Sequence, residues 1–260
     1  MKILFIGDIV GRPGRGAVRR IVPKLRQEKR IEFVVANAEN VAGGSGITPE
    51  TATELLDSQV DILTSGDHIW KQRDIYAELD SNNRILRPVN YPETCPGRGV
   101  TVLKARNGLK VGVINVLGRV FMRNVDACPF KTSEAAILEI GKSANIILVD
   151  IHAEATSEKV ALGRFLDGRV SAIFGSHTHV QTADEKILPK GSAYISDVGM
   201  TGSQDSVIGR KTDLIIEHFL TCMPIKFALA DKDVELQGVI VEVDQKTGRA
   251  VSIERVREKL

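Results

Sequence analysis

Short apolar runs alternate along much of the chain with segments in which apolar residues recur at helical spacing. This alternation is typical of strand–helix units in an α/β protein. Several runs contain no polar alternate, which favours strands covered on both faces. The predicted strands of this part are Lys2–Ile6, Glu32–Ala36, Ile62–Thr64, Gly99–Lys104, Lys110–Val116, Ile146–Asp150 and Ala172–Phe174.

Four helices are predicted between these strands. Thr48 followed by Pro49 is typical of a helix start, with threonine as the N-cap and proline in the first turn. The other helices are indicated by apolar positions at helical spacing. The predicted helices are Pro13–Lys29, Pro49–Leu56, Ser133–Lys142 and Ser157–Leu166, the last of which is ended by Gly168.

The C-terminal part predicts strands, at Ala193–Ser196, Gln237–Val243 and Ala250–Val256. The last two are joined by a short polar turn that ends in glycine, which predicts a hairpin. The sequence contains no internal repeat and no Pro/Ser-rich linker. We therefore expect one domain over residues 1–260, with a mixed sheet or two packed sheets between helices.

Composition narrows the class of protein. The 260 residues are 43% hydrophobic and 26% charged, which excludes a disordered chain, and the net charge of +2 gives no footprint for nucleic acid or a membrane surface. The apolar runs are too short to span a bilayer, and no signal peptide precedes the first strand. Three cysteines without paired spacing favour a reducing compartment over a disulfide framework. We expect a cytoplasmic protein.

Residues that can bind metal follow five of the predicted strands at the point where each strand ends. Four of the five histidines lie in these strings. The carboxyl ends of neighbouring strands in an open α/β sheet share one edge, so the side chains are expected to converge on one cleft. The strings are Gly7-Asp8, Asn37-Ala38-Glu39-Asn40, Ser65-Gly66-Asp67-His68, Asp150-Ile151-His152 and Gly175-Ser176-His177-Thr178-His179.

The residue types in these strings indicate a catalytic metal site. Carboxylate, amide and imidazole ligands without thiolate favour manganese, iron or zinc over a structural zinc site. The donors are too many for one catalytic ion with open positions. Two ions that share a carboxylate, about 3.5–4 Å apart, fit better and suit in-line displacement at phosphorus. Taken singly, Asp8 could instead cap the following helix, and Asn40 could be a turn residue.

The sequence resembles the YmdB-like branch of the calcineurin-like metallophosphoesterases over nearly its whole length. The resemblance is carried by Gly-Asp-Ile-Val-Gly, Asn-Ala-Glu-Asn, Ser-Gly-Asp-His-Ile-Trp, Asp-Ile-His-Ala-Glu-Ala-Thr-Ser-Glu-Lys and Gly-Ser-His-Thr-His-Val-Gln-Thr-Ala-Asp. It implies an α/β fold in which a β-sandwich is flanked by helices in four layers (αββα). It also implies two divalent ions, iron or manganese with zinc or magnesium as alternatives, and hydrolysis of 2′,3′-cyclic nucleotides or related phosphodiesters.

The resemblance further implies a role for each residue of the cluster. One ion would be held by Asp8, Glu39, Asn40 and His179, and the other by Asp67, His152, His177 and the bridging Glu39. A metal-bridging hydroxide would attack phosphorus, and His68 would be the general acid that protonates the leaving oxygen. His68 has an open alternative as a histidine that only orients a ligand.

Two positions depart from patterns of the wider family. Many metallophosphoesterases have histidine where this chain has Val10, as its own branch does. Where the family string is Gly-Asn-His, this chain has Gly66-Asp67-His68. Aspartate supplies the same ligand oxygen but adds a negative charge, which lowers the Lewis acidity of the ions, repels a phosphodiester and strengthens metal binding. The sign of the effect on turnover stays open.

Other interpretations of the same centre also stay open. A phosphomonoesterase would use the same ligands, and a metal-binding regulatory protein would have an activity weakened by Asp67. Beside a small phosphodiester substrate, RNA ends could enter the cleft, and a homo-oligomer is expected. Arg12, Arg98 and Arg119 could neutralise a phosphate, although a solvated surface arginine is the commoner role for each.

Two further features have an ordinary structural alternative. The glycine-rich stretch Gly43–Gly46 could bring backbone N–H groups close to a phosphate, but a plain turn is the commoner use. Trp70 and Tyr91 could stack on a base, but packing in the core is the commoner use of both.

Overall fold

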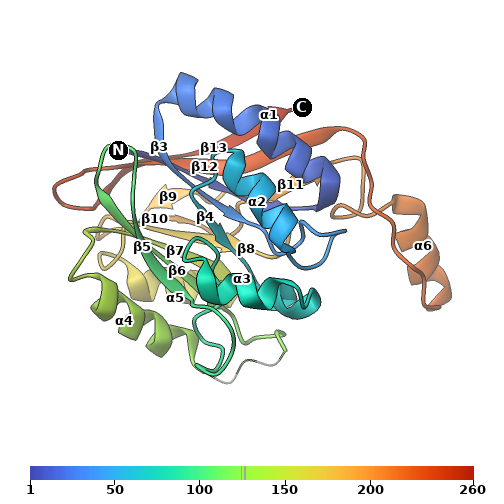
Figure 1. Cartoon of the computed structure of the whole chain (residues 1–260), viewed down its shortest axis with the longest axis horizontal. Coiled ribbons are helices and arrows are strands. Elements are labelled where there is room, and N and C mark those ends of the chain that lie inside the picture. The colour runs from blue at the N-terminus through green and yellow to red at the C-terminus, as the bar shows by residue number, and fades with distance from the viewer. Residues whose placement is uncertain (124, 126) are drawn as a thin grey trace.

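Two β-sheets packed face to face form the centre of the structure, a computed structural model that describes residues 1–123, 125 and 127–260 (Figure 1). The first sheet has seven strands in the order β2 (Asp8–Ile9), β11 (Met200–Ser203), β12 (Val234–Val243), β1 (Lys2–Ile6), β3 (Ile31–Asn37) and β4 (Ile62–Thr64), with β13 (Ala250–Lys259) paired to β12. The second has six, in the order β5 (Val100–Lys104), β6 (Lys110–Leu117), β7 (Ile146–His152), β8 (Ala172–Ser176), β10 (Ala193–Ile195) and β9 (Lys186–Ile187).

Helices cover the outer faces of both sheets (Figure 1). The helices are α1 (Gly11–Lys29), α2 (Pro49–Asp57), the 3₁₀ helix η1 (Asp67–Lys71), α3 (Ile75–Ser81), α4 (Pro129–Ile140), α5 (Thr156–Leu166) and α6 (Thr212–Thr221). In the described part of the chain, no helix has the length and apolar character that crossing a membrane requires.

Three separate apolar clusters account for the four layers. Leu4 of β1 packs with Val18 of α1 on the outer side of the seven-stranded sheet. Phe5 points the opposite way and stacks on Phe174 of β8, with 4.5 Å between ring centroids, in the cluster between the two sheets. A third cluster joins α4 and α5 to the outer face of the six-stranded sheet. Because every side chain from Ile3 to Ile6 meets an apolar layer, this part of β1 has no polar residue at alternate positions.

The predicted fold class is therefore confirmed, in its two-sheet form. Strands Lys2–Ile6 and Ile62–Thr64 and the hairpin of β12 and β13 are confirmed, as is Thr48 as the N-cap of α2. The other predicted strands and helices are present with ends shifted by a few residues. The assignment of residues 1–260 to one domain stays a prediction.

Several elements were not predicted, namely β2, β9, β11, α3, η1 and α6. β2 and β11 are too short to show a period and are stabilised by pairing with each other. α6 carries apolar residues at helical spacing, Ile215 with Phe219 and Ile216 with Leu220, but it buries only Ile215 among the residues that the structure describes. Figure 1 shows α6 standing away from the sheets.

Candidate metal centre

The ends of strands from both sheets meet at one place. In the seven-stranded sheet, Asp8 begins β2, Glu39 and Asn40 follow β3, and Asp67 and His68 begin η1 after β4. In the six-stranded sheet, β7 ends at His152, and His177 and His179 follow β8. The predicted convergence on one cleft is confirmed, and the cluster lies across the boundary between the two sheets.

Glu39 lies in the middle of the cluster and is buried. Its Oε1 lies 3.3 Å from Nε2 of His152 and 3.4 Å from Nδ1 of His68. Asp67 Oδ1 lies 3.7 Å from the same His152 nitrogen, and His177 Nδ1 lies 2.9 Å from it. One ligand atom each from Glu39, Asp67, His152 and His177 lie within 4.8 Å of one another, a spacing that a single ion can span.

A second group lies on the other side of Glu39. The Oδ1 of Asp8 is 3.6 Å from Nε2 of His179. The side-chain amide nitrogen of Asn40 lies 3.3 Å from that nitrogen and 3.1 Å from Oε1 of Glu39. The backbone N–H of His177 donates to the other oxygen of Asp8 at 3.1 Å. The structure thus brings together all seven residues of the predicted ligand set, in two groups that share Glu39.

The donors fit divalent ions. The Oδ1 atoms of Asp8 and Asp67 are buried and have no hydrogen-bond partner among the described residues. A buried, unpartnered carboxylate oxygen is costly, and a cation removes that cost. The cluster offers carboxylate, amide and imidazole groups and no thiolate, the set preferred by manganese, iron and zinc.

Burial opposes ionisation of the three carboxylates, but the facing histidines outweigh it. The pKa of Glu39 is below its ordinary value because the charge of His152 overcomes desolvation. The same balance lowers the pKa of Asp8, through the facing His179, and the pKa of Asp67, through His152. The cluster is anionic in its carboxylates and ready to accept positive charge.

The imidazoles respond in both directions. Burial lowers the pKa of His177, and the neighbouring His152 lowers it further. Burial also disfavours the charged form of His152, but Glu39 and Asp67 raise its pKa well above the ordinary value. Protons on these nitrogens occupy the positions that ions would take, so metal and proton compete and metal binding should strengthen as the pH rises.

Comparisons with known proteins assign the family. A sequence model described as YmdB-like protein matches residues 4–256. The chain belongs to the YmdB-like family. The 2′,3′-cyclic-nucleotide 2′-phosphodiesterase of Bacillus subtilis (strain 168) is 46% identical to this YmdB-like chain over 256 residues, 98% of this chain and 96% of that protein.

Two solved structures are similar along the whole chain. A protein from Thermus thermophilus is 39% identical with a TM-score of 0.92, covering 100% of this chain and 99% of that one. A structure described as a novel phosphatase from Mycoplasma pneumoniae is 34% identical with a TM-score of 0.93, covering 100% and 93%. The resemblance found in the sequence motifs is therefore confirmed, together with the fold.

His68 of this YmdB-like chain lies at the edge of the cluster. Its Nδ1 lies 2.8 Å from Oδ1 of Asn40, and its backbone N–H donates to Oε2 of Glu39 at 3.2 Å. The side chain is 32% exposed and lines a cavity of about 360 Å³ over the centre. The contact at Nδ1 fixes the ring and leaves Nε2 without a partner among the described residues, which is the arrangement that a proton donor to substrate needs.

Gly66 has a steric role that only the structure reveals. A Cβ at this position would lie 2.1 Å from Cδ2 of His152 and 2.3 Å from Oε2 of Glu39. The backbone before Asp67 therefore passes directly against two groups of the centre, and any side chain there would displace them.

A hydrogen-bonded group behind His152 was not predicted as a unit. Ser176 Oγ lies 3.0 Å from Nδ1 of His152 and donates to Oδ1 of Asp150 at 2.7 Å. Asn37 and Thr64 donate to the other oxygen of Asp150, at 3.2 and 2.5 Å. Asp150 precedes His152 by two residues on the same strand face, so alternation along β7 could have indicated the contact. Such partners fix the tautomer and orientation of a metal-binding histidine.

Arg210 was missed by sequence reasoning because no motif marks it. It lines the cavity over the centre, and its Nη2 donates to the carbonyl of Gly44 at 2.6 Å. A Cβ on Gly44 would lie 2.6 Å from the guanidinium, so the glycine stretch gives Arg210 room to approach.

Neither Arg98 nor Arg119 is among the described residues lining this cavity. Trp70 and Tyr91 pack edge to face, with 5.4 Å between their ring centroids, against the outer apolar cluster of the seven-stranded sheet. This agrees with packing in the core as the role of both side chains.

Proposed function

We propose that this protein hydrolyses phosphodiesters at a centre of two divalent ions, with 2′,3′-cyclic nucleotides as its substrate class. The observation that carries the proposal is the buried cluster of carboxylates and imidazoles, with two unpartnered carboxylate oxygens, beneath an open cavity. The identity of 46% to the Bacillus subtilis phosphodiesterase supports the same substrate class.

We assign Asp8, Asn40 and His179 to one ion, Asp67, His152 and His177 to the other, and Glu39 to both. The two groups of distances on either side of Glu39 support this division. Iron or manganese is proposed first, with zinc or magnesium as alternatives, because the donors combine imidazole with carboxylate and include no thiolate. The cytoplasmic location and the homo-oligomer expected from the sequence stay predictions.

The residues around the centre divide the work of the reaction. Bound divalent ions supply Lewis-acid stabilisation of the phosphate and activation of water. His68, held at Nδ1 by Asn40, donates a proton from Nε2 to the departing ribose oxygen. Arg210 also lines the cavity and would contribute positive charge toward a phosphate bound there. Asn37, Ser176 and Asp150 hold the His152 ring through its other nitrogen.

The first experiment is Mn²⁺-dependent hydrolysis of a 2′,3′-cyclic nucleotide by the protein and its Asp67→Asn variant, with metal content measured in both. Turnover by both supports the proposal and makes Asp67 a tolerated ligand. Turnover by the variant alone means that one extra charge suppresses the chemistry. Inactivity of both with two ions bound contradicts the proposal and favours a regulatory metal protein. A preference for a phosphomonoester would favour the phosphatase that the Mycoplasma pneumoniae structure is described as.

His68→Ala tests the general acid. We expect turnover to fall by about 10²–10⁴, with metal content unchanged, because the side chain contacts Asn40 and Glu39 but lies at the edge of the ligand set. The loss should shrink on a nitrophenyl phosphodiester, whose leaving group needs no proton. An equal loss on both substrates would indicate a histidine that only orients the centre.

A further inference from the structure

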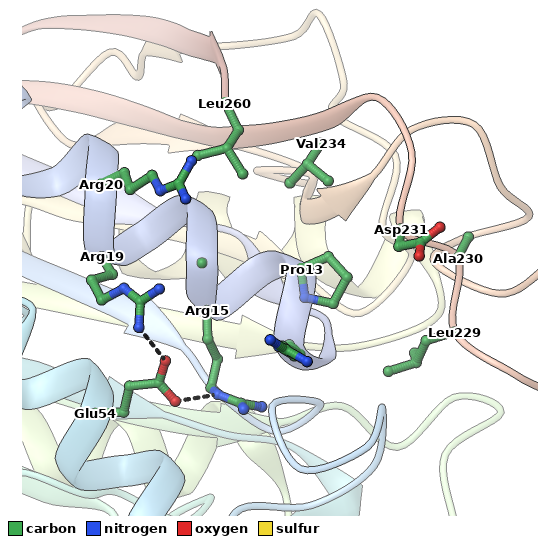
Figure 2. Close-up of a pocket in the computed structure, with 12 residues that line it drawn as sticks. Pro13, Arg15, Arg19, Arg20, Glu54, Leu229, Ala230, Asp231, Val234 and Leu260 are labelled. Carbon is green, nitrogen blue, oxygen red and sulfur yellow. Dashed lines mark hydrogen bonds and ion pairs between the residues drawn. The ribbon is translucent and has the colours of Figure 1, made fainter.

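A second cavity lies beside the metal centre, along α1 (Figure 2). Its volume is about 550 Å³, against about 360 Å³ over the centre, and cavities of about 300–1,000 Å³ typically bind organic ligands of nucleotide size. Residues Leu229–Asp231 and Val234 form the wall that faces α1 (Figure 2). We call this cavity the arginine cleft, after the four α1 residues that line it, Arg12, Arg15, Arg19 and Arg20.

The four arginines are not equally engaged. Arg15 has a structural contact, because its Nε lies 2.6 Å from Glu54 and it also donates to the carbonyl of Val41. Arg19 lies 4.0 Å from the same carboxylate (Figure 2). Arg12 and Arg20 are exposed and form no ion pair with any residue that the structure describes. Like charges three or four residues apart on a helix repel each other, so an anion bound in the cleft would reduce the repulsion among these arginines.

The arginine cleft adjoins the cavity over the metal centre. Val10 lines the cavity and Arg12 lines the cleft, and the two Cα atoms are at most about 7 Å apart along the chain. Gly11 lies between them in the sequence, and Leu229 of the cleft wall packs directly on it, because a Cβ on Gly11 would lie 2.2 Å from the Leu229 side chain. Arg210, on the cavity side, pairs through its backbone with the same leucine. Positive charge thus continues from one cavity into the next.

We propose that the arginine cleft binds the phosphodiester backbone of an RNA strand whose 3′ end, carrying the 2′,3′-cyclic phosphate, enters the metal centre. The inference rests on the proposed function, since it extends that substrate from a single nucleotide to the end of a chain. At about 3.4 Å per stacked nucleotide, roughly two nucleotides cover the separation between Val10 and Arg12. No aromatic side chain lines the cleft in the described part of the protein, so it reads phosphates and not bases.

The test compares a 2′,3′-cyclic mononucleotide with an oligoribonucleotide of about eight nucleotides that ends in the same group, within the range of about 4–16 nucleotides bound by single-strand grooves. The variant is Arg12→Gln, Arg19→Gln and Arg20→Gln together, which leaves the structural Arg15 in place. The control is Lys131→Gln, Lys142→Gln and Arg164→Gln, which removes the same charge from exposed positions in and beside α4 and α5.

We expect the KM for the oligonucleotide to lie about tenfold below that for the mononucleotide, and the arginine variant to abolish the difference without changing kcat. The KM for the mononucleotide and both constants of the control variant should stay within about twofold. If three phosphates are contacted, a plot of log affinity for the oligonucleotide against log salt concentration should have a slope of about −2. The arginine variant should have a slope closer to zero. Asp231→Asn should tighten oligonucleotide binding, because Asp231 lines the cleft and its negative charge repels a phosphate there.

Equal KM values for the two substrates, or an arginine variant that leaves the oligonucleotide KM unchanged, would overturn the inference while the proposed function stands. An equal loss of mononucleotide and oligonucleotide binding would also overturn it, because the cleft would then be a site for free nucleotides. If neither substrate is hydrolysed, the proposed function fails, and fluorescence anisotropy of a labelled oligonucleotide with a 3′-phosphate still decides the cleft by the same variants and salt series.

Discussion

The two sheets bring different chemistry to the centre. The seven-stranded sheet supplies every oxygen ligand of the proposed set, in Asp8, Glu39, Asn40 and Asp67, whereas the six-stranded sheet supplies only imidazoles. Charge is therefore separated across the boundary between the sheets, with carboxylates on one side and the nitrogens that face them on the other. Carboxylates of one edge thus lie close to imidazole nitrogens of the other, and the ions of the proposed centre would be held from both sides.

The difference extends to how each edge is held. Glu39 is fixed by two hydrogen bonds within its own sheet. Its backbone N–H donates to Oδ1 of Asn37, and its carboxylate accepts from the backbone N–H of His68. The imidazoles need additional contacts, because the ring must be oriented so that the correct nitrogen faces the metal centre. His152 is held by Ser176 and Asp150, and His177 and His179 adopt φ values of 99° and 65°, a region that non-glycine residues rarely occupy. Strain at functional residues of this kind is sustained by the surrounding structure.

The largest effect is expected on the oxygen side. Glu39→Gln removes the ligand that we propose both ions share, so we expect the loss of both metals and a fall in turnover on the order of 10³ or more. Inductively coupled plasma mass spectrometry and hydrolysis rates measure the two effects. Glu154→Gln is the matched control, because this carboxylate lies 3.2 Å from His177 but is 51% exposed at the rim of the cavity. Retention of two ions by Glu39→Gln would contradict the bridging role.

A smaller effect is expected behind the imidazoles. Ser176→Ala breaks the link between His152 and Asp150, and such changes typically cost about 10–100-fold in metal affinity. The loss should fall on the ion bound by His152 and leave the ion at Asp8 and His179 in place. Metal titration would show one weakened site. Ser171→Ala, a buried serine at the opposite end of β8, should leave both affinities unchanged.

The smallest effect concerns the loop that returns from His179 to the six-stranded sheet. Burial opposes ionisation of Asp184, but hydrogen bonds from Ser196 and Thr182 lower its pKa below the ordinary 3.8. The ionised carboxyl therefore stabilises the fold above about pH 4, and the contribution is lost as the pH falls toward the lowered value.

Asp184→Asn should reduce the free energy of unfolding by about 1 kcal/mol at pH 6–7, after allowance for partial exposure, and by less below pH 4. Denaturant unfolding at several pH values checks this. The double variant Asp184→Asn, Ser196→Ala should lose less unfolding free energy than the sum of the losses in the two single variants, because the two residues share one contact. Full additivity, or a loss that is independent of pH, would contradict this account.

Much of the fold follows from local pattern, and the reasons are visible in particular elements. β1 and β4 were predictable because their side chains meet apolar layers on both faces, and α2 because Thr48 and Pro49 mark its start. β2 was not, because two residues carry no period and the strand exists only through pairing with β11. Patterns report on burial, and these elements depend on a partner far away in the sequence.

The centre divides in the same way. Its ligands were predictable because polar residues interrupt the chain where apolar strands end, and the family motifs cover them. Arg210 and the contacts of Asp150 were not, because each acts through a neighbour that only the folded chain supplies. Net charge likewise gave no indication of the arginine cleft, since an average over the chain conceals a row of arginines on one helix.

The position of β12 has a consequence for how the protein is made. In the seven-stranded sheet β12 lies between β1 and β11, although it is synthesised after both. The strand that leads to Asp8 therefore waits for residues 234–243 to leave the ribosome before it gains its antiparallel neighbour. Long-range pairing of this kind slows folding, and the centre should acquire its ions only after β12 has paired with β1. Chains stalled before β12 should therefore hold little metal.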